Sequence, residues 1–501
     1  MQSIDKKALN ADEVIAITGG FSSLQATFFF CNCMFEIYCG LQAAMPIYSG
    51  MRPSFHCSLP NFESNTCNKS CPSYIYPNQH GTTAAEFDLA CGLRSWLNSL
   101  FKSSYWVGYL VGVIVSGYFF DRYGRKKVII ALCLGQGIFS FLLLFIENIH
   151  LLIACRLLIG FFVSGGAIGT HLITLEYMPS SQIAIASQFS QLCFPTGEIF
   201  AVFFGYLFKN DWRMLFFVLA LPTPFFFIGS IFFYPESFRW LLAVGRITEA
   251  EDIARQLAIR NGYPQVAEDL YLINKAKLNS NGPVVYTWKN LFWPSNVLCL
   301  TLTLCLICYG CSSVYYGLTY GVQDLSGNIY MNSFLMAVAE FPAFFVYMSA
   351  NAIGRKYTTA LLLLISGVAV IMVPFLLQLA GGLLTIGISL IGKMASTGIF
   401  EILFFYQVEL FPSAVRGIGI GVCFMFARIA VIISPVFQNL GSISVCIPYL
   451  VYAFPSLLAV IVTMIFLPET KGKNLPDTFE DVFYKSISSS DRVTTSHERL
   501  L

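Results

Sequence analysis

Twelve long apolar stretches constrain this sequence more than any other feature. Each comes close to the roughly 20 apolar residues that an α-helix needs to cross the hydrocarbon core of a bilayer. The stretches cover 22–44, 105–120, 128–146, 150–172, 186–208, 213–234, 297–320, 330–350, 358–379, 384–405, 417–437 and 447–467. Charged residues make up only 12% of the chain, whereas soluble domains usually carry about 25%. The sequence therefore predicts an all-α membrane protein with twelve transmembrane helices.

The distribution of Lys and Arg predicts the orientation of these helices. Most of the 30 basic residues fall in the two termini, in the segment 235–296 and in the short turns 121–127 and 351–357. Twelve crossings put all of these on one side, and cytoplasmic loops carry the excess of Lys and Arg. We therefore expect a multi-pass protein of the plasma membrane with both termini in the cytoplasm. A net charge of +2 gives no indication of a nucleic-acid partner.

One long loop, 45–104, is predicted to lie outside the cell and to be crosslinked. It contains four cysteines: Cys57, Cys67, Cys71 and Cys91. An even number of cysteines in an oxidising compartment predicts two disulfides, for which three pairings are open. The spacing of Cys67 and Cys71 is also compatible with a metal site, but the nearby histidines lack ligand spacing, so we expect no metal and no cofactor. Asn68 begins a glycosylation sequon.

Three short motifs recur at a nearly constant offset along the chain. They pair 121–126 with 351–356, 176–180 with 409–413, and 235–237 with 468–470. Each pair occupies the same place in a set of six helices, so the matches indicate a duplication. The predicted parts are a cytoplasmic N-terminus (1–21), a six-helix half (22–234), a cytoplasmic linker (235–296), a second six-helix half (297–467) and a cytoplasmic tail (468–501). Two such repeats around a midplane site are typical of transporters.

These motifs resemble those of a known family. The segment 117–126 is similar to the loop signature of the major facilitator superfamily. Segments 235–241, 409–416 and 468–472, together with the cysteine-bearing loop, resemble the organic cation, carnitine and organic anion transporters. The resemblance implies the major facilitator fold, with two parallel six-helix halves, and transport by alternating access. No metal, nucleotide or nucleophile motif indicates an enzyme.

The resemblance also implies that the cytoplasmic turns latch one state of the transporter. We expect Arg125 to pair with a carboxylate across the seam between the halves, and Asn351 in place of Asp121 predicts a weaker second latch. The alternative is that these basic residues only anchor the turns on the cytoplasmic side. The predicted gating residues are Asp121, Arg125, Glu176, Glu236, Arg239, Arg355, Glu409 and Arg416.

Charged residues inside the predicted spans say most about function, because a charge at mid-bilayer costs about 2.5–3.5 kcal/mol on insertion scales. Most lie on polar stripes at helical spacing. The predicted substrate-binding residues are Glu36, Gln191, Glu198, Tyr315, Tyr316, Glu340, Glu401 and Arg428. The alternative is that such charges form buried ion pairs between helices. The sequence leaves this open for Arg156 and for Lys393 with Glu401.

Two residues of this set bear on the charge of the substrate. Arg428 resembles the arginine of anion and carnitine carriers, whereas Glu340 resembles the acid of cation and carnitine carriers. Four acids against one or two bases disfavour a dianion. We therefore predict a carrier of small organic cations or carnitine-like zwitterions in a lipid bilayer, with coupling to Na⁺ or H⁺ left open. An organic anion exchanger of the same family is the closest alternative.

Overall fold

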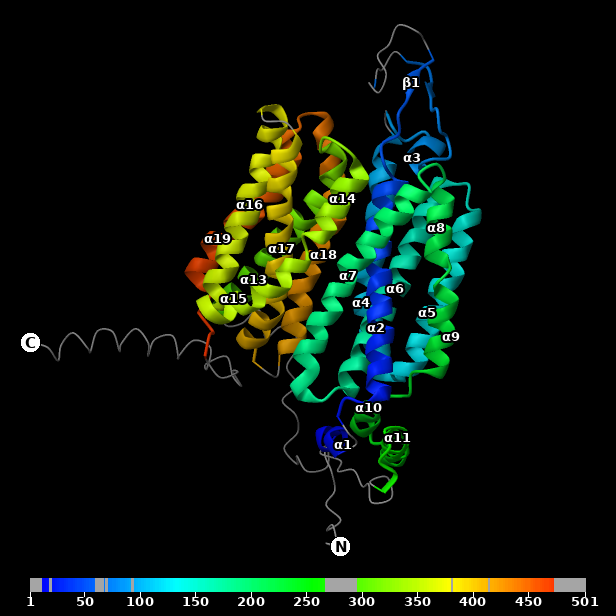
Figure 1. The fold of residues 1–501 in the computed structure, drawn as a ribbon, viewed down its shortest axis with the longest axis vertical. Helices are drawn as coiled ribbons and strands as arrows, with labels where there is room; N and C mark the ends of the chain where they lie inside the picture. The colour runs from blue at the N-terminus through cyan, green and yellow to red at the C-terminus, as the bar shows by residue number, and fades with distance from the viewer. Residues whose placement is uncertain are drawn as a thin grey trace, which may run out of the picture. The chain divides into compact units, whose positions relative to one another are not determined.

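The computed structural model describes residues 11–17, 20–58, 67, 71–91, 94–265, 295–379, 382–412 and 415–472. These residues are mostly helical, with one small two-stranded sheet. The chain divides into two compact units, Met1–Pro283 and Val284–Leu501. Each unit is a bundle of long helices (Figure 1), as expected for one half of a duplicated membrane protein.

In the N-terminal half, the long helices follow the predicted stretches. Their bounds are α2 Ser23–Ser49, α4 Trp96–Tyr123, α5 Arg125–Leu142 with η2 Leu143–Phe145, α6 Ile149–Tyr177, α7 Ser180–Leu207, α8 Trp212–Ala220 and α9 Thr223–Phe232. A short helix, α1 (Ala11–Ile17), precedes them. α2 packs along α7, and α4 packs along α6. Helices that are distant in sequence are therefore neighbours in the bundle.

The C-terminal half has the same kind of architecture with one broken helix. Its elements are α13 Ser295–Gly321, η5 Val322–Asp324, α14 Ile329–Val338, η6 Phe341–Phe345, α15 Val346–Ile353, α16 Arg355–Leu379, α17 Gly382–Leu410, α18 Arg416–Gln438, η7 Asn439–Ser442 and α19 Cys446–Phe466. α13 packs against α18 and α19, and α16 packs against α17 and α19. Buried apolar side chains such as Leu304, Ile399 and Leu403 form the core between them.

Every predicted stretch is helical over most of its length, and the predicted all-α fold is confirmed. Among the described residues, 10 helices are long and apolar enough to cross a membrane. The fifth and eighth predicted crossings are not among them: α7, and the α14–η6–α15 stretch. These two carry Glu198 and Glu340. The eighth crossing is apolar but is divided into shorter helical pieces, and the break in it carries Glu340.

The loop 45–104 contains the small sheet and two disulfides. β1 (His56–Cys57) pairs antiparallel with β2 (Tyr74–Ile75), and α3 (Thr83–Glu86) follows. The two predicted disulfides are present, and the pairing left open by the sequence is Cys57–Cys71 and Cys67–Cys91. The predicted glycosylation residue, Asn68, lies outside the described residues.

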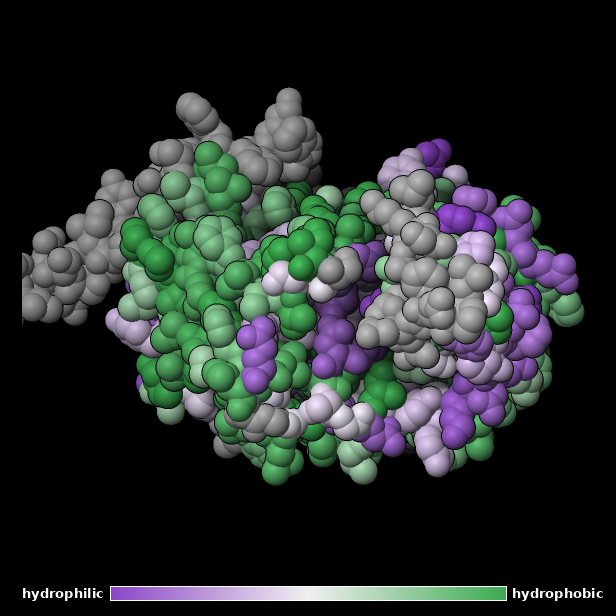
Figure 2. Space-filling view, turned by 90° about the horizontal axis from the view of Figure 1, so that it is seen from above, coloured by the Kyte–Doolittle hydropathy of each residue, from purple (hydrophilic) through white to green (hydrophobic). Residues whose placement is uncertain are grey.

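This loop and the linker lie at opposite ends of the N-terminal half. Figure 1 shows β1 and α3 at the upper end of this half, and α10 (Phe238–Val244) and α11 (Ile247–Arg260) at the lower end. Seen from the upper end, hydrophilic residues gather on the N-terminal half, whereas hydrophobic residues cover most of the C-terminal half (Figure 2). Five predicted crossings lie between the loop and the linker, and an odd number of crossings requires this separation.

Glu86, the last residue of α3, ties the loop to the first turn of α8. Its carboxylate accepts hydrogen bonds from Trp212 Nε1 at 2.7 Å and from Arg213 Nη1 at 2.6 Å. His80 Nδ1 lies 3.4 Å from the same carboxylate. Burial alone would raise the pKa of Glu86, but the donors from Arg213 and Trp212 outweigh it and hold the pKa below its usual range.

A glycine with a positive φ makes the same tight turn in both halves. Gly124 joins α4 to α5 with φ of 93°, and Gly354 joins α15 to α16 with φ of 120°. A Cβ atom at either position would lie 2.5 Å from a carboxylate oxygen, of Glu236 in the first half and of Glu469 in the second. Each turn therefore needs glycine both for its backbone conformation and for space.

Replacing Glu86 with Gln is expected to lower stability near neutral pH and to flatten its dependence on pH. A carboxylate with a depressed pKa contributes stability above its unfolded pKa of about 4.3, and loses it as the pH falls through the lower folded value. The melting temperature of the detergent-purified protein, measured from neutral pH to about pH 3, should fall more for the wild type than for E86Q. The exposed Glu147, replaced in E147Q, is the control. Parallel pH profiles for wild type and E86Q would contradict this role.

Replacing Gly354 with Ala should destabilise the C-terminal half by about 1–3 kcal/mol, because a side chain at this φ is strained and collides with Glu469. Thermal unfolding of the purified protein measures the loss. Gly117 within α4 is the matched control, because a Cβ there meets nothing within 4 Å. G354A as stable as G117A would show that the turn tolerates a side chain.

Candidate transport site

At the end of the N-terminal half that carries α10, Arg125 joins three segments of the chain. Its guanidinium pairs with Glu176 at 3.1 Å and donates to the carbonyl oxygen of Phe120 at 2.9 Å. The backbone amides of Arg125 and Lys126 donate to the Glu236 carboxylate at 2.6 and 3.3 Å. An anion is favourable at the first amides of a helix, so Glu236 caps α5 from a distant part of the sequence.

Two side chains of α10 extend this network. Arg239 Nε donates to the carbonyl oxygen of Glu176 at 2.7 Å, and Trp240 Nε1 donates to the carbonyl oxygen of Asp121 at 2.8 Å. The carboxylate of Asp121 lies 3.4 Å from Arg125, but its side chain is 82% exposed. An ion pair so close to water contributes little stability. The half-buried contacts of Glu176 and Glu236 therefore contribute more to the network than the Asp121 pair does.

The C-terminal half repeats this network with the duplicated residues. Arg355 pairs with Glu409 at 3.2 Å, and the amides of Arg355 and Lys356 donate to Glu469 at 2.9 and 3.1 Å. Thr470 Oγ1 donates to the other oxygen of Glu409 at 2.6 Å. The duplicated sequence motifs thus make equivalent contacts in the two halves.

The contacts of these turns bear on three of the predicted gating residues. The carboxylate of Glu176, which pairs with Arg125, belongs to the same half, and a pairing of Arg125 across the seam stays a prediction. The change from Asp121 to Asn351 costs the second network little, because Asp121 lies at the exposed edge of the first. Arg416 pairs with no acid among the described residues, and its Nε donates to the carbonyl oxygen of Phe411 at 3.2 Å.

A buried ion pair lies inside the C-terminal half. Lys393 Nζ on α17 and Glu340 Oε1 are 3.0 Å apart, and the two side chains are 0% and 2% exposed. Lys393 Nζ also donates to Thr319 Oγ1 at 2.6 Å, and Tyr315 Oη donates to Glu340 at 2.8 Å. The same Nζ lies 3.2 Å from the centre of the Tyr315 ring, within the range of a cation–π contact. Residues of α13, α17 and the break in the eighth crossing thus form one polar cluster.

This cluster changes the interpretation of two predicted residues. Glu340, a predicted substrate-binding residue, forms an ion pair with Lys393 in this structure, and its contact with substrate stays a prediction. The sequence left open an ion pair of Lys393 with Glu401 on its own helix, and the structure shows Lys393 paired with Glu340. Lys393 itself was not among the predicted binding residues. In the sequence, Lys393 is a single base within an apolar helix. Such a charge needs an acid nearby to compensate it.

Arg156 on α6 is fully buried and joins four helices of the N-terminal half. It donates to Gln42 Oε1 on α2 at 2.7 Å. Its guanidinium also lies 4.7 Å from the centre of the Tyr105 ring on α4 and 5.2 Å from that of Phe216 on α8. These contacts support the packing role that the sequence left open for Arg156.

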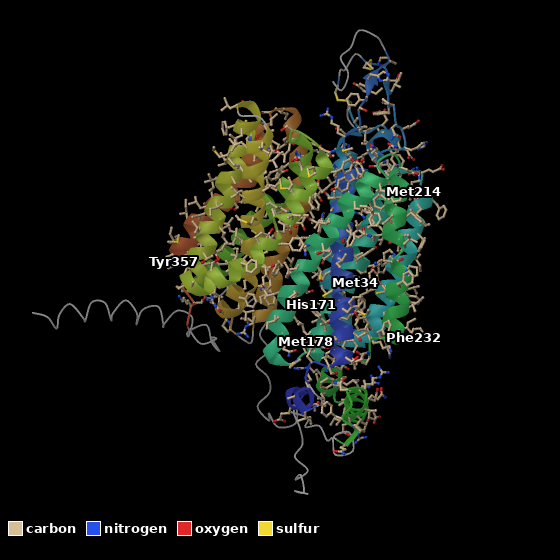
Figure 3. The ribbon with its side chains drawn as sticks, in the orientation of Figure 1. Met34, His171, Met178, Met214, Phe232 and Tyr357 are labelled. Carbon is tan, nitrogen blue, oxygen red and sulfur yellow. A yellow bond between two sulfur atoms is a disulfide. The ribbon has the colours of Figure 1, made fainter. Side chains whose placement is uncertain are left out.

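The acidic candidates of the N-terminal half lie on adjoining helices. Glu36 on α2 is half-buried and Glu198 on α7 is 6% exposed. Asn32, one turn before Glu36, donates to Ser190 on α7 at 2.7 Å, so the polar stripes of α2 and α7 meet. Gln191, on the same stretch of α7, is exposed. Figure 3 shows the side chains of this half, with Met34 of α2 and His171 of α6 labelled.

Tyr316, Glu401 and Arg428 complete the predicted set. Tyr316 packs edge-on against Tyr315, with ring centres 4.8 Å apart. Glu401 lies on α17 and Arg428 on α18, and both are half-buried. Within the described ranges, no group of three or more His, Cys, Asp and Glu residues is arranged to hold a metal ion.

Comparison with known proteins places the chain among transporters. It matches the family model described as "Sugar (and other) transporter" over residues 23–481. It is 30% identical to organic cation/carnitine transporter 2 of Mus musculus over 86% of this chain and 77% of that protein. It is also 30% identical to organic anion transporter 3 of Oryctolagus cuniculus over 85% and 78%. A solute carrier family 22 member 15-like protein of Xenopus tropicalis is 28% identical over 97% and 100%.

Solved structures support the fold. The xylose transporter XylE from E. coli, in an inward-open conformation, matches with a TM-score of 0.66 and 17% identity over 90% of this chain and 98% of that one. This likeness confirms the predicted major facilitator fold. The protein is therefore a multi-pass membrane transporter and not an enzyme, and it belongs to the major facilitator superfamily, among the organic cation, carnitine and organic anion transporters of solute carrier family 22.

Proposed function

We propose that this transporter carries small organic cations or carnitine-like zwitterions by alternating access. The observation that carries the proposal is the balance of charge within the membrane-spanning helices. Within the twelve apolar stretches, and apart from Arg213 at the first position of the sixth, four acids (Glu36, Glu198, Glu340 and Glu401) lie against three bases (Arg156, Lys393 and Arg428). A surplus of acid in a medium of low dielectric constant favours a substrate that brings positive charge and disfavours a dianion.

Contacts within each half divide these charges into groups. Lys393 neutralises Glu340 at 3.0 Å, and Gln42 with aromatic rings holds Arg156. We assign Arg428 on α18 to the carboxylate of a zwitterion, and Glu401 on α17 or Glu340 to its ammonium group. Each end then meets one opposite charge, which is the least costly arrangement in a buried site.

The names of two relatives correspond to the two candidate classes of substrate, organic cations with carnitine and organic anions. One is an organic cation/carnitine transporter and the other an organic anion transporter, and each is 30% identical to this chain. Similarity alone therefore does not select between them, whereas the surplus of acid favours the first. An organic anion exchanger remains the second candidate because Arg428 lies within α18.

The remaining features fit a carrier of the plasma membrane with both termini in the cytoplasm. The networks of Arg125 and Arg355 tie the turns of each half together, so that each half moves as a unit during alternating access. Glycosylation of Asn68 is expected on the external loop. A membrane potential of 100 mV contributes about 2.3 kcal/mol per charge, so a uniported cation would accumulate roughly 50-fold.

Uptake of three labelled compounds tests the substrate class. Cells that express the protein are given tetraethylammonium, carnitine or an aryl carboxylate, with and without sodium. We expect uptake of the cation, the zwitterion or both above that of untransfected cells, and little uptake of the carboxylate. Uptake of the carboxylate alone would overturn the proposal in favour of the anion exchanger.

Replacing Arg428 with Ala should separate zwitterions from cations. Loss of a hydrogen bond to a charged group costs about 1.5–3 kcal/mol, so kcat/KM for a carnitine-like zwitterion should fall about tenfold or more. Uptake of a cation without a carboxylate should remain. R428K, which keeps the charge, is the matched control and should retain part of the zwitterion uptake. Unchanged zwitterion uptake in R428A would remove Arg428 from the site.

A further inference from the structure

The surroundings of the Lys393 ammonium form a complete binding site for an organic ammonium ion. Nζ is 3.0 Å from the Glu340 carboxylate, 2.6 Å from the Thr319 hydroxyl and 3.2 Å from the centre of the Tyr315 ring. These ligands are a counter-charge, a hydrogen-bond acceptor and an aromatic face. Alkylammonium groups are commonly recognised by such a set.

We propose that the Lys393 side chain is a tethered competitor of the substrate: it occupies an ammonium site that a cationic substrate enters by displacing it. The inference rests on the proposed function, since it requires a positively charged substrate. It gives a role in cation binding to Lys393, whose positive charge by itself would repel a cation. Lys393 then sets the affinity of the site and keeps Glu340 compensated between transport cycles.

The broken helix that carries Glu340 supplies the movement that this exchange needs. α14 ends at Val338, Glu340 lies in the break, and η6 then runs from Phe341 to Phe345. Pro342, which cannot donate a backbone hydrogen bond, lies in η6. A stretch of 3-10 helix within a span often marks a hinge, and broken helices are typical of transporter binding sites.

The chemistry of the competitor explains why lysine suits this role. Lys has a compact charge on a flexible stem, so it can leave Glu340 by rotation about its side-chain bonds. Arg would hold the carboxylate through a planar pair of donors and would also stack on the Tyr315 ring. We therefore expect opposite changes in affinity when Lys393 is made neutral and when it is made Arg.

Uptake kinetics with two ammonium probes test the competition. For phenethylammonium, K393M should lower KM about tenfold, if Lys393 leaves the site free about one tenth of the time. K393R, which keeps the charge and the buried pair, should raise KM. The double variant E340Q/K393M removes both charges and should lose the gain. For tetraethylammonium, which has no N–H to donate to Thr319, the gain in K393M should be smaller.

A binding measurement keeps the test decisive if K393M fails to reach the membrane. The purified K393A variant has space where the ammonium lay, so added ethylammonium should raise its melting temperature, with much less effect on the wild type or on E340Q/K393A. Tetramethylammonium should stabilise K393A less. Stabilisation of K393A that matches that of the wild type would overturn the proposal, and so would an unchanged KM in both K393M and K393R. Uptake by the wild type tests the proposed function separately. If the wild type carries no cation, the proposed function is wrong, whatever the Lys393 variants show.

Discussion

The free-energy cost of placing a charge in the hydrocarbon core of a bilayer explains the contacts that the charged residues within the spans make. At about 2.5–3.5 kcal/mol per residue on insertion scales, every charge within a span must be compensated by a partner, a polar cavity or a substrate. Lys393 and Glu340 show the first solution, with a 3.0 Å pair between nearly inaccessible side chains. Arg156 shows a second, in which an amide and aromatic rings surround the guanidinium. The same constraint makes each remaining charge within a span informative about function.

The duplicated turns show how a second set of charges serves the fold. Glu236 and Glu469 each accept amide hydrogen bonds at the start of a helix, and Arg125 and Arg355 each pair with an acid from a later turn. These contacts close within one half of the chain. Alternating access requires halves that stay rigid while they move, and these half-buried networks contribute to that rigidity by joining the turns of each half.

Much of the fold was accessible from the sequence because it depends on local patterns. Apolar length located the twelve helices, and the recurring motifs located the two halves and the residues of their turns. The disulfide pairing was not accessible, since four cysteines allow three pairings that only the folded loop distinguishes. The break at Glu340 was also missed, because Pro342 shows that a helix is weakened but not how it continues.

The candidate site was predicted less completely, for a physical reason. Helical spacing identifies which residues share a face, but it does not give the rotation of one helix against another. It therefore could not show that Lys393 meets Glu340 on another element. The distances around Lys393 come from the packing of α13 and α17 with the broken helix, which no short motif records.

We propose that the surplus acids within the spans are counter-charges for a positively charged group of the substrate. The current evoked by substrate in voltage-clamped cells tests this most directly, because it reports the sign of the charge that moves. The account predicts an inward current when an organic cation is added outside, growing as the membrane potential is made more negative. An outward current evoked by an organic anion, with no current from any cation, would contradict it.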